Sequence, residues 1–329
     1  MRIVSLLPSA TEIVALLGKA RELVARSHEC DWSPDPVIAQ LPVATRSLID
    51  HAAPAAAIDA TVREAARSNR PLNELVTGVL EQLRPDVILT QGLCPVCAID
   101  PDAVRAAAQS LPNCPEVVTL SPAGLEDVLD DVLRVARAIG AEPQGERAVH
   151  ALRERLFRAQ EFVTPYVTGP VVAFLEWTDP PFVAGHWTVQ MIERAGGLHP
   201  WNPTQPKPLA GAAAGPQQGE RLAGKSVAVD PALIAALNPE RVVLAPCGMT
   251  LARVRTEAEA LMRQDWFREL PAVRAAIRGD QSRVALVDGN QMFNRPGPRV
   301  IDAFEWLVGW LNDRPELTPE GFPWEPLCV

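Results

Sequence analysis

The sequence is poor in cysteine, in tyrosine and in long apolar runs. Its 6 cysteines among 329 residues are too few for the disulfide framework that staples small secreted domains. No segment approaches the roughly 20 consecutive apolar residues of a membrane-spanning helix, so we expect no membrane insertion. Tyrosine occurs once, at Tyr166, in a segment that has the pattern of a connector, so aromatic contacts to a ligand must come from tryptophan or phenylalanine.

Positive charge is also scarce. Lys and Arg number 31 against 40 Asp and Glu, a formal net charge of −9, which argues against a broad surface for nucleic acid or anionic membrane and favours a small-molecule partner. The apolar run that opens the chain stops at Pro8, too early for a secretory signal peptide. We therefore expect a cytoplasmic protein, or a periplasmic one if the true N-terminus differs.

Strand and helix patterns alternate along the first half of the chain. Residues 2–6, 87–89 and 116–120 are apolar runs typical of buried strands. Helix patterns stand between them, one with Ser9 and Glu12 as an expected capping box and one with Asp100 as N-cap before Pro101. Strands that alternate with helices predict a parallel sheet.

A long charged helix pattern over residues 144–167 interrupts this alternation, which resumes with apolar runs at 171–175, 242–245 and 284–287. The fold class predicted is α/β, with two Rossmann-like lobes of mainly parallel sheets, one long connecting helix and a ligand cleft between the lobes. The predicted domains are an N-terminal lobe over 1–143, the connector over 144–168 and a C-terminal lobe over 169–329.

Polar and aromatic side chains gather directly after the predicted strands. In open parallel sheets ligands bind beyond the carboxyl ends of the strands, where loops are free to vary on a rigid support. Aromatic walls with a few polar groups are typical of a small-molecule site. The residues expected to contact the ligand are His28, Glu29, Cys30, Asp31, Trp32, Glu176, Trp177, Phe182, His186, Trp187, Asn290, Phe293, Asn294 and Arg295.

Four segments carry a resemblance to a known family. They are SLLPSATE at 5–12, SHECD at 27–31, PPFVAG at 180–185 and DGNQMFNRPGPR at 288–299. Together they resemble the cobalamin-binding branch of the helical-backbone (class III) periplasmic binding proteins of ABC transporters. The resemblance implies two lobes on a rigid helix, cobalamin bound with little domain closure, and delivery to the permease of an ABC importer.

The cysteines leave other hypotheses open. Cys94 and Cys97 have the C-x-x-C spacing that lets two thiolates reach one ion, and Cys30 and Cys247 would complete a four-thiolate set for zinc or an iron-sulfur cluster. A thiol oxidoreductase that uses Cys94 and Cys97 is a further alternative. His28 and His186 are candidate metal ligands too, including an axial position on cobalt.

Catalytic residues are not expected. The sequence shows no set of nucleophile, base and orienting group, and no glycine loop that would cradle a phosphate. The first hypothesis is therefore a binding protein that holds a corrinoid without converting it.

Overall fold

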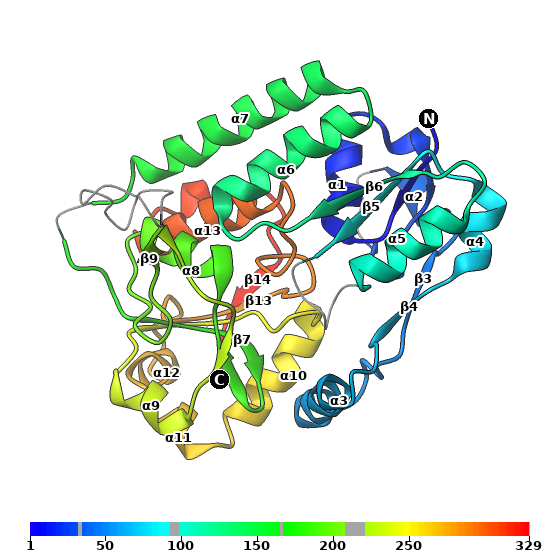
Figure 1. Cartoon of the computed structure of the whole chain (residues 1–329). Coiled ribbons are helices and arrows are strands. Elements are labelled where there is room, and N and C mark those ends of the chain that lie inside the picture. The colour runs from blue at the N-terminus through cyan, green and yellow to red at the C-terminus, as the bar shows by residue number, and fades with distance from the viewer. Residues whose placement is uncertain (32–34, 93–98, 165–166, 208–220, 329) are drawn as a thin grey trace. The chain divides into compact units, whose positions relative to one another are not determined.

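The computed structural model describes residues 1–31, 35–92, 99–164, 167–207 and 221–328. By their internal contacts these residues form two units (Figure 1). Unit 1 comprises 1–122, 126–152 and 296–298, and unit 2 comprises 123–125, 153–295 and 299–329. The domain boundaries predicted at residues 143 and 168 stay a prediction.

A parallel four-stranded sheet of order β2-β1-β5-β6 forms the centre of unit 1. Its strands are β1 (Ile3–Ser5), β2 (Leu23–Ala25), β5 (Val87–Gln91) and β6 (Glu116–Leu120). The helices of this unit are α1 (Pro8–Leu16), α2 (Pro36–Ala39), α3 (Ala55–Arg67), α4 (Thr77–Leu83), α5 (Pro101–Ser110) and α6 (Leu125–Ala138), with a 3-10 turn at Ala20–Glu22. Strands β1 and β5 and most of α1 are buried, because an apolar strand inside a parallel sheet needs cover on both faces.

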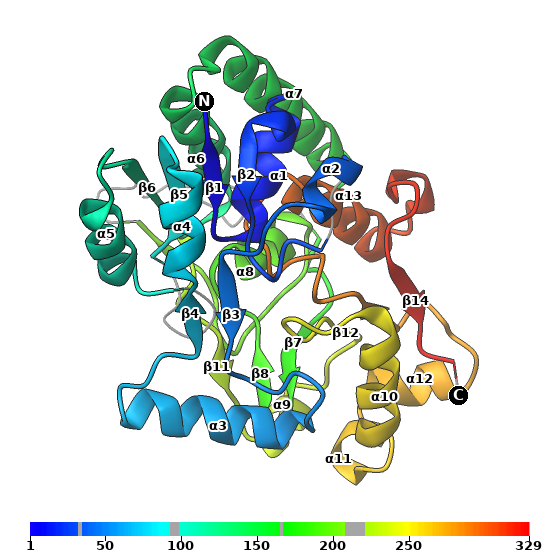
Figure 2. The same ribbon diagram turned by 90° about the vertical axis from the view of Figure 1, so that its right-hand side faces the viewer.

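A second, antiparallel pair in unit 1 joins β3 (Thr45–Ser47) to β4 (Asn73–Leu75). Helix α3 lies beyond this pair, away from the parallel sheet, in both ribbon views (Figures 1 and 2). The sequence patterns did not predict this ribbon, because strands of three residues leave too short a signal.

Two helix ends are formed as the sequence patterns predict, and a third is not. Asp100 caps α5, its side chain accepting from the backbone N–H of Asp102 at 3.0 Å, with Pro101 as the first helical residue. The expected capping box at Ser9 and Glu12 is wrong. Helix α1 begins at Pro8 after Leu7, so both residues lie inside the helix and are buried. Gly18 follows it with φ of +73°, the left-handed conformation that ends helices.

Helix α7 (Glu142–Gln160) is the predicted connector and has 19 residues. Its first part belongs to unit 1 and its last part to unit 2. Within unit 1 it packs on α6 at Gly145, where an added Cβ would lie 2.5 Å from that of Ala136. Glycine is therefore required for this close approach.

Unit 2 is built on a six-stranded sheet of order β11-β8-β7-β12-β13-β14. Strands β7, β12 and β13 are parallel, and the others pair antiparallel at the two edges. The strands are β7 (Val172–Thr178), β8 (Pro181–Val183), β11 (Val227–Ala228), β12 (Arg241–Leu244), β13 (Val284–Val287) and β14 (Trp324–Pro326), and β9 (Gln205–Pro206) pairs separately with β10 (Arg221–Leu222). The α/β class is therefore confirmed, with a parallel sheet in unit 1 and a mixed sheet in unit 2.

The helices of unit 2 are α8 (His186–Arg194), α9 (Pro231–Ala236), α10 (Leu251–Leu261), α11 (Asp265–Arg268), α12 (Pro271–Ile277) and α13 (Val300–Leu311), with a 3-10 turn at Pro315–Leu317. Helix α13 is buried along most of its length, and Trp306 stacks on Trp310 and Phe322, as its apolar spacing predicts. Arg155 of α7 holds α13 through bonds to Asp302 at 2.6 Å and to Glu305 at 2.5 and 3.0 Å.

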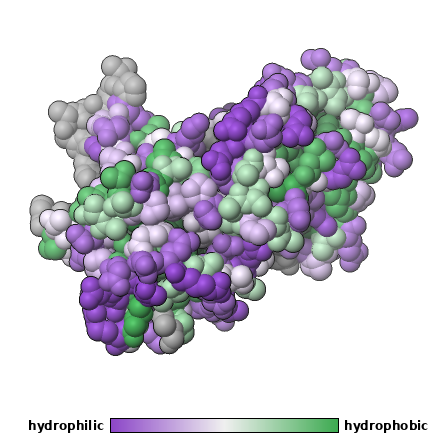
Figure 3. Space-filling model, turned by 90° about the horizontal axis from the view of Figure 1, so that it is seen from below, coloured by the Kyte–Doolittle hydropathy of each residue, from purple (hydrophilic) through white to green (hydrophobic). Residues whose placement is uncertain are grey.

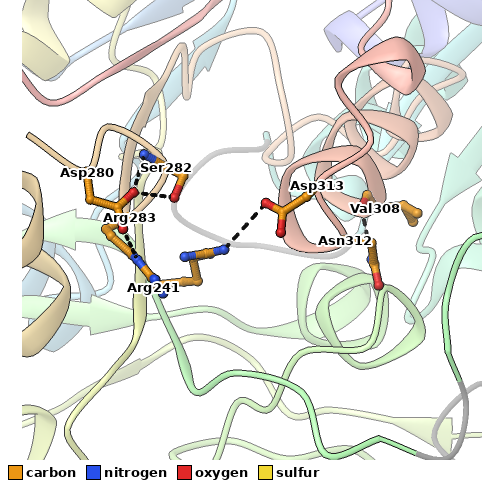
Figure 4. Close-up of polar contacts among 7 residues, drawn as sticks. All are labelled: Arg241, Asp280, Ser282, Arg283, Val308, Asn312 and Asp313. Carbon is orange, nitrogen blue, oxygen red and sulfur yellow. Dashed lines mark hydrogen bonds and ion pairs between the residues drawn. The ribbon is translucent and has the colours of Figure 1, made fainter.

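A buried arginine marks the start of β12. The Arg241 side chain is 8% exposed and reaches Asp313, after α13, at 3.9 Å (Figure 4). Its guanidinium also lies 5.6 Å from the centre of the Trp310 ring.

No helix in the described part of the chain is long and apolar enough to cross a membrane. The face drawn in Figure 3 mixes hydrophilic residues with apolar ones.

Candidate functional site

The loops after the three parallel strands of unit 2 are joined by hydrogen bonds. After β12, the backbone N–H of Cys247 donates to the carbonyl of Glu176 in β7 at 3.0 Å. The amide of Asn294, in the loop after β13, donates to the carbonyls of Ala245 at 3.0 Å and Gly289 at 2.8 Å. Within unit 2, the strand-end loops that the sequence singled out are therefore held together.

The loop after β13 is rigidly braced. Asp288 accepts from the backbone N–H of Gln291 at 2.9 Å and from that of Leu251 at 3.0 Å. Arg295 donates to the side-chain oxygen of Asn290 at 2.9 Å. This loop therefore keeps its shape through bonds within the protein.

Two of the predicted aromatic contacts pack into the core of unit 2. Phe293 is 1% exposed, and its ring lies 4.8 Å from that of Phe174 and 5.9 Å from that of Trp306. Trp187 is 6% exposed and donates its indole N–H to the carbonyl of Phe293 at 2.6 Å. Trp177 and Phe182, which pair across β7 and β8, keep more exposed surface.

Glu176 stands at a β-bulge between Leu175 and Trp177. Its carboxylate accepts from the Ser226 hydroxyl and from the Gly185 backbone N–H, the latter at 3.4 Å. Thr188 also donates to it, and burial nevertheless raises the pKa of Glu176 to about 7. The carboxylate is thus bound by the protein's own donors, and sequence reasoning missed Ser226 because it lies 50 residues away.

His186, the first residue of α8, has φ of +49° and donates its backbone N–H to the Gly224 carbonyl at 2.8 Å. Its ring stacks against Trp187, with centres 5.7 Å apart. Burial, together with the charge of Lys225, lowers the pKa of His186. Both effects favour the neutral form of the ring.

Unit 1 presents a smaller cluster at the carboxyl end of its sheet. The Thr11 hydroxyl lies 2.8 Å from the Ser5 hydroxyl and 3.0 Å from Cys30 Sγ. Cys30 is 2% exposed, so its thiol is a buried structural group. Glu29 is half-buried and Asp31 is exposed.

His28 lies in the same loop, and its ring is held by Thr45 of β3. Nδ1 is 2.6 Å from the Thr45 hydroxyl oxygen, which also accepts from the His28 backbone N–H at 2.9 Å. Burial, and to a smaller extent the charge of His51, lowers the pKa of His28. Sequence patterns missed Thr45, because only the chain's path through β3 brings it to His28.

The cysteine hypotheses are not favoured. The described residues contain no group of three or more His, Cys, Asp or Glu side chains that could hold a metal ion. Cys247 is exposed, and Cys30 is engaged with Thr11. Cys94, Cys97 and Trp32 lie outside the described residues. Neither a zinc nor an iron-sulfur site is seen among the residues described, and metal binding through cysteine has no support.

The chain is similar to known proteins over almost its whole length. No family model matches it. A vitamin B12-binding protein of Vibrio cholerae is 22% identical over 316 residues, which cover 94% of this chain and 89% of that protein. The structure of the periplasmic heme-binding protein RhuT from Roseiflexus in apo form superposes with a TM-score of 0.65 at 21% identity, covering 95% of this chain and 98% of the other.

The structure of the periplasmic vitamin B12-binding protein BtuF of Vibrio cholerae gives a TM-score of 0.63 at 18% identity, covering 95% of this chain and 97% of the other. The predicted two-lobed fold is thereby confirmed. The predicted cytoplasmic location is wrong, since these matches are to periplasmic proteins. The error came from judging location by the opening residues.

Proposed function

From the fold of the class III periplasmic binding proteins, which this chain has, and from its confirmed resemblance to their cobalamin-binding branch, we propose that it binds a corrinoid such as cobalamin in the periplasm. It binds the ligand without converting it and delivers it to the permease of an ABC importer. The observation that carries this proposal is the extent of the match to the vitamin B12-binding protein, 94% of this chain and 89% of the relative.

The strand-end loops support binding by a preformed surface. In unit 2, hydrogen bonds fix the loop after β13 and the start of α8, so little ordering remains to oppose ligand binding. Trp177, Phe182 and His186 keep exposed surface there and supply flat faces for a flat ring. We assign these three, with His28 and Glu29 of unit 1 and Asn290 of unit 2, to ligand contact.

Titration of the full chain with cyanocobalamin, followed by calorimetry, tests the proposal. We expect one molecule bound per chain. Trp177→Ala should weaken binding about two- to tenfold, because one stacked ring contributes about 0.5 to 1.5 kcal/mol. Trp266→Ala is the matched control, since that tryptophan lies in α11 and bonds to Gln264.

Hemin is the second probe, because the solved structures that superpose on this chain include heme-binding proteins. If the chain binds hemin and does not bind cyanocobalamin, the corrinoid assignment is overturned. Binding of neither would contradict the proposed function itself.

A further inference from the structure

We propose that His28 Nε2 is an axial ligand to the metal ion of the bound tetrapyrrole, so that a ligand with an exchangeable axial position gains a bond to the protein that other ligands lack. This rests on the proposed function and assigns one contact within it. Two properties of His28 carry the proposal: a ring that the protein holds in place, and a buried ring nitrogen for which the described residues supply no hydrogen-bond partner.

Thr45 fixes the ring. Its hydroxyl oxygen lies 2.6 Å from Nδ1 and also accepts from the His28 backbone N–H at 2.9 Å. One hydroxyl therefore holds both the ring and the backbone of the same residue. Such a partner on the far nitrogen is what orients histidines that bind metals.

The same hydroxyl can accept the ring proton. Thr45 Oγ1 lies 3.2 Å from the Ser27 hydroxyl, to which it can donate its own proton, and 2.6 Å from Nδ1. In the tautomer that carries its proton on Nδ1, the ring donates to Thr45 and Nε2 keeps its lone pair, the form in which imidazole binds a metal ion.

Nε2 has no hydrogen-bond partner among the residues that the structure describes, although it is a buried nitrogen. Buried polar atoms normally have partners, so an orphaned one points to a ligand. His199 also has an orphaned Nε2, but that residue is 2% exposed in the core and packs on Trp201. His28 instead keeps exposed surface in a strand-end loop.

Other imidazole and thiol groups described in unit 1 do not match. His51 is exposed, and its Nε2 lies 3.0 Å from the Ser47 hydroxyl. His150 is exposed on α7. Cys30 is buried against Thr11.

The step is a ligand exchange. The Nε2 lone pair forms a bond to cobalt(III), the bond from cobalt to an axial water breaks, and the water leaves. The imidazole keeps its proton on Nδ1, and no electron is transferred. A corrinoid whose two axial positions are firmly occupied cannot undergo this exchange.

Visible absorption spectra of the full chain titrated with diaquacobinamide test the assignment, with cyanocobalamin as the probe whose axial positions are filled. We expect the corrin bands of diaquacobinamide to shift on binding and those of cyanocobalamin to stay in place. His28→Gln should bind diaquacobinamide without the shift and at least tenfold more weakly. His51→Gln is the matched control and should keep both shift and affinity.

Thr45 supplies a second test that leaves the imidazole in place. Thr45→Val removes the acceptor for Nδ1 and should weaken diaquacobinamide binding several-fold, whereas Thr45→Ser should restore it. If circular dichroism shows that His28→Gln fails to fold, the comparison of Thr45→Val with Thr45→Ser still tests the axial ligand.

A shift that persists in His28→Gln, or corrinoid binding to the native chain without any shift, would overturn the axial ligand and leave the proposed function standing. Failure of the native chain to bind diaquacobinamide, cyanocobalamin or hemin would overturn both.

Discussion

Trp187 donates its indole N–H to the carbonyl oxygen of Phe293 over 2.6 Å, across 106 residues of sequence. This bond ties the first turn of α8 to the loop after β13. Both residues are buried, so the bond is shielded from water and the carbonyl has no solvent to replace its donor.

We expect Trp187→Phe to lower the free energy of unfolding by about 1 to 3 kcal/mol, because it keeps an aromatic ring but leaves the Phe293 carbonyl buried without that donor. Denaturant unfolding of the full chain measures this. Trp266→Phe, whose donor lies on the surface, should change the value by less than about 0.5 kcal/mol. Equal losses in both variants would show that ring size, and not the hydrogen bond, matters.

Glu176 gives the stability of the protein a pH dependence of defined sign. Burial raises its pKa from 4.5 to about 7, so between these values the folded chain holds a proton that the unfolded chain releases. The contribution of Glu176 to stability is therefore complete below about pH 4.5 and is lost as the pH rises through about 7.

Glu176→Gln should flatten this dependence, because glutamine is neutral throughout. Unfolding free energies measured from pH 4.5 to 8 in both proteins test it. The difference between native chain and variant should change with pH between about 4.5 and 7 and level off above that. Parallel curves would contradict the assignment to Glu176.

Arg241 is a buried cation, and few polar contacts among the described residues offset the desolvation of its charge. Among the described residues its ion-pair partner is Asp313, which is 81% exposed and lies 3.9 Å away (Figure 4). Its Nε and Nη1 have no hydrogen-bond partner in the described part of the chain. Because desolvation of a charge opposes the gain from such a weak pair, Arg241→Met should leave stability unchanged or raise it by about 1 kcal/mol.

The matched variant is Arg241→Ala, which also removes the packing of the side chain on Trp310. It should be less stable than Arg241→Met by about 1 to 3 kcal/mol, the cost of a cavity. Thermal unfolding compares the three proteins. A loss above about 2 kcal/mol in Arg241→Met would show that the buried charge is itself stabilising.

Much of the fold could be predicted from local patterns. The strands expected at 116–120 and 284–287 are β6 and β13 to the residue, and the start of α5 at Asp100 and Pro101 is as predicted. Buried strands and capped helices carry their signal within a few neighbouring residues. The short antiparallel strands β8, β11 and β14 left no such signal, since each has at most three residues and exists through its partners.

The candidate site was likewise predicted only in part from the sequence. The sequence located its loops, because a polar group that directly follows an apolar strand can be recognised by position alone. It also named His28, Glu176 and Trp187 as residues of interest. It did not name Thr45 or Ser226, which bond to the first two from 17 and 50 residues away.

The sequence by itself thus determined the alternation of strands and helices, the two lobes and the set of strand-end loops, since each of these follows from the order of apolar and polar residues along the chain. Only the tertiary structure decided which side chains are braced, which are buried and which nitrogen of His28 has no hydrogen-bond partner among the described residues. Those properties depend on donors and acceptors that approach from distant segments, and no local pattern encodes that approach.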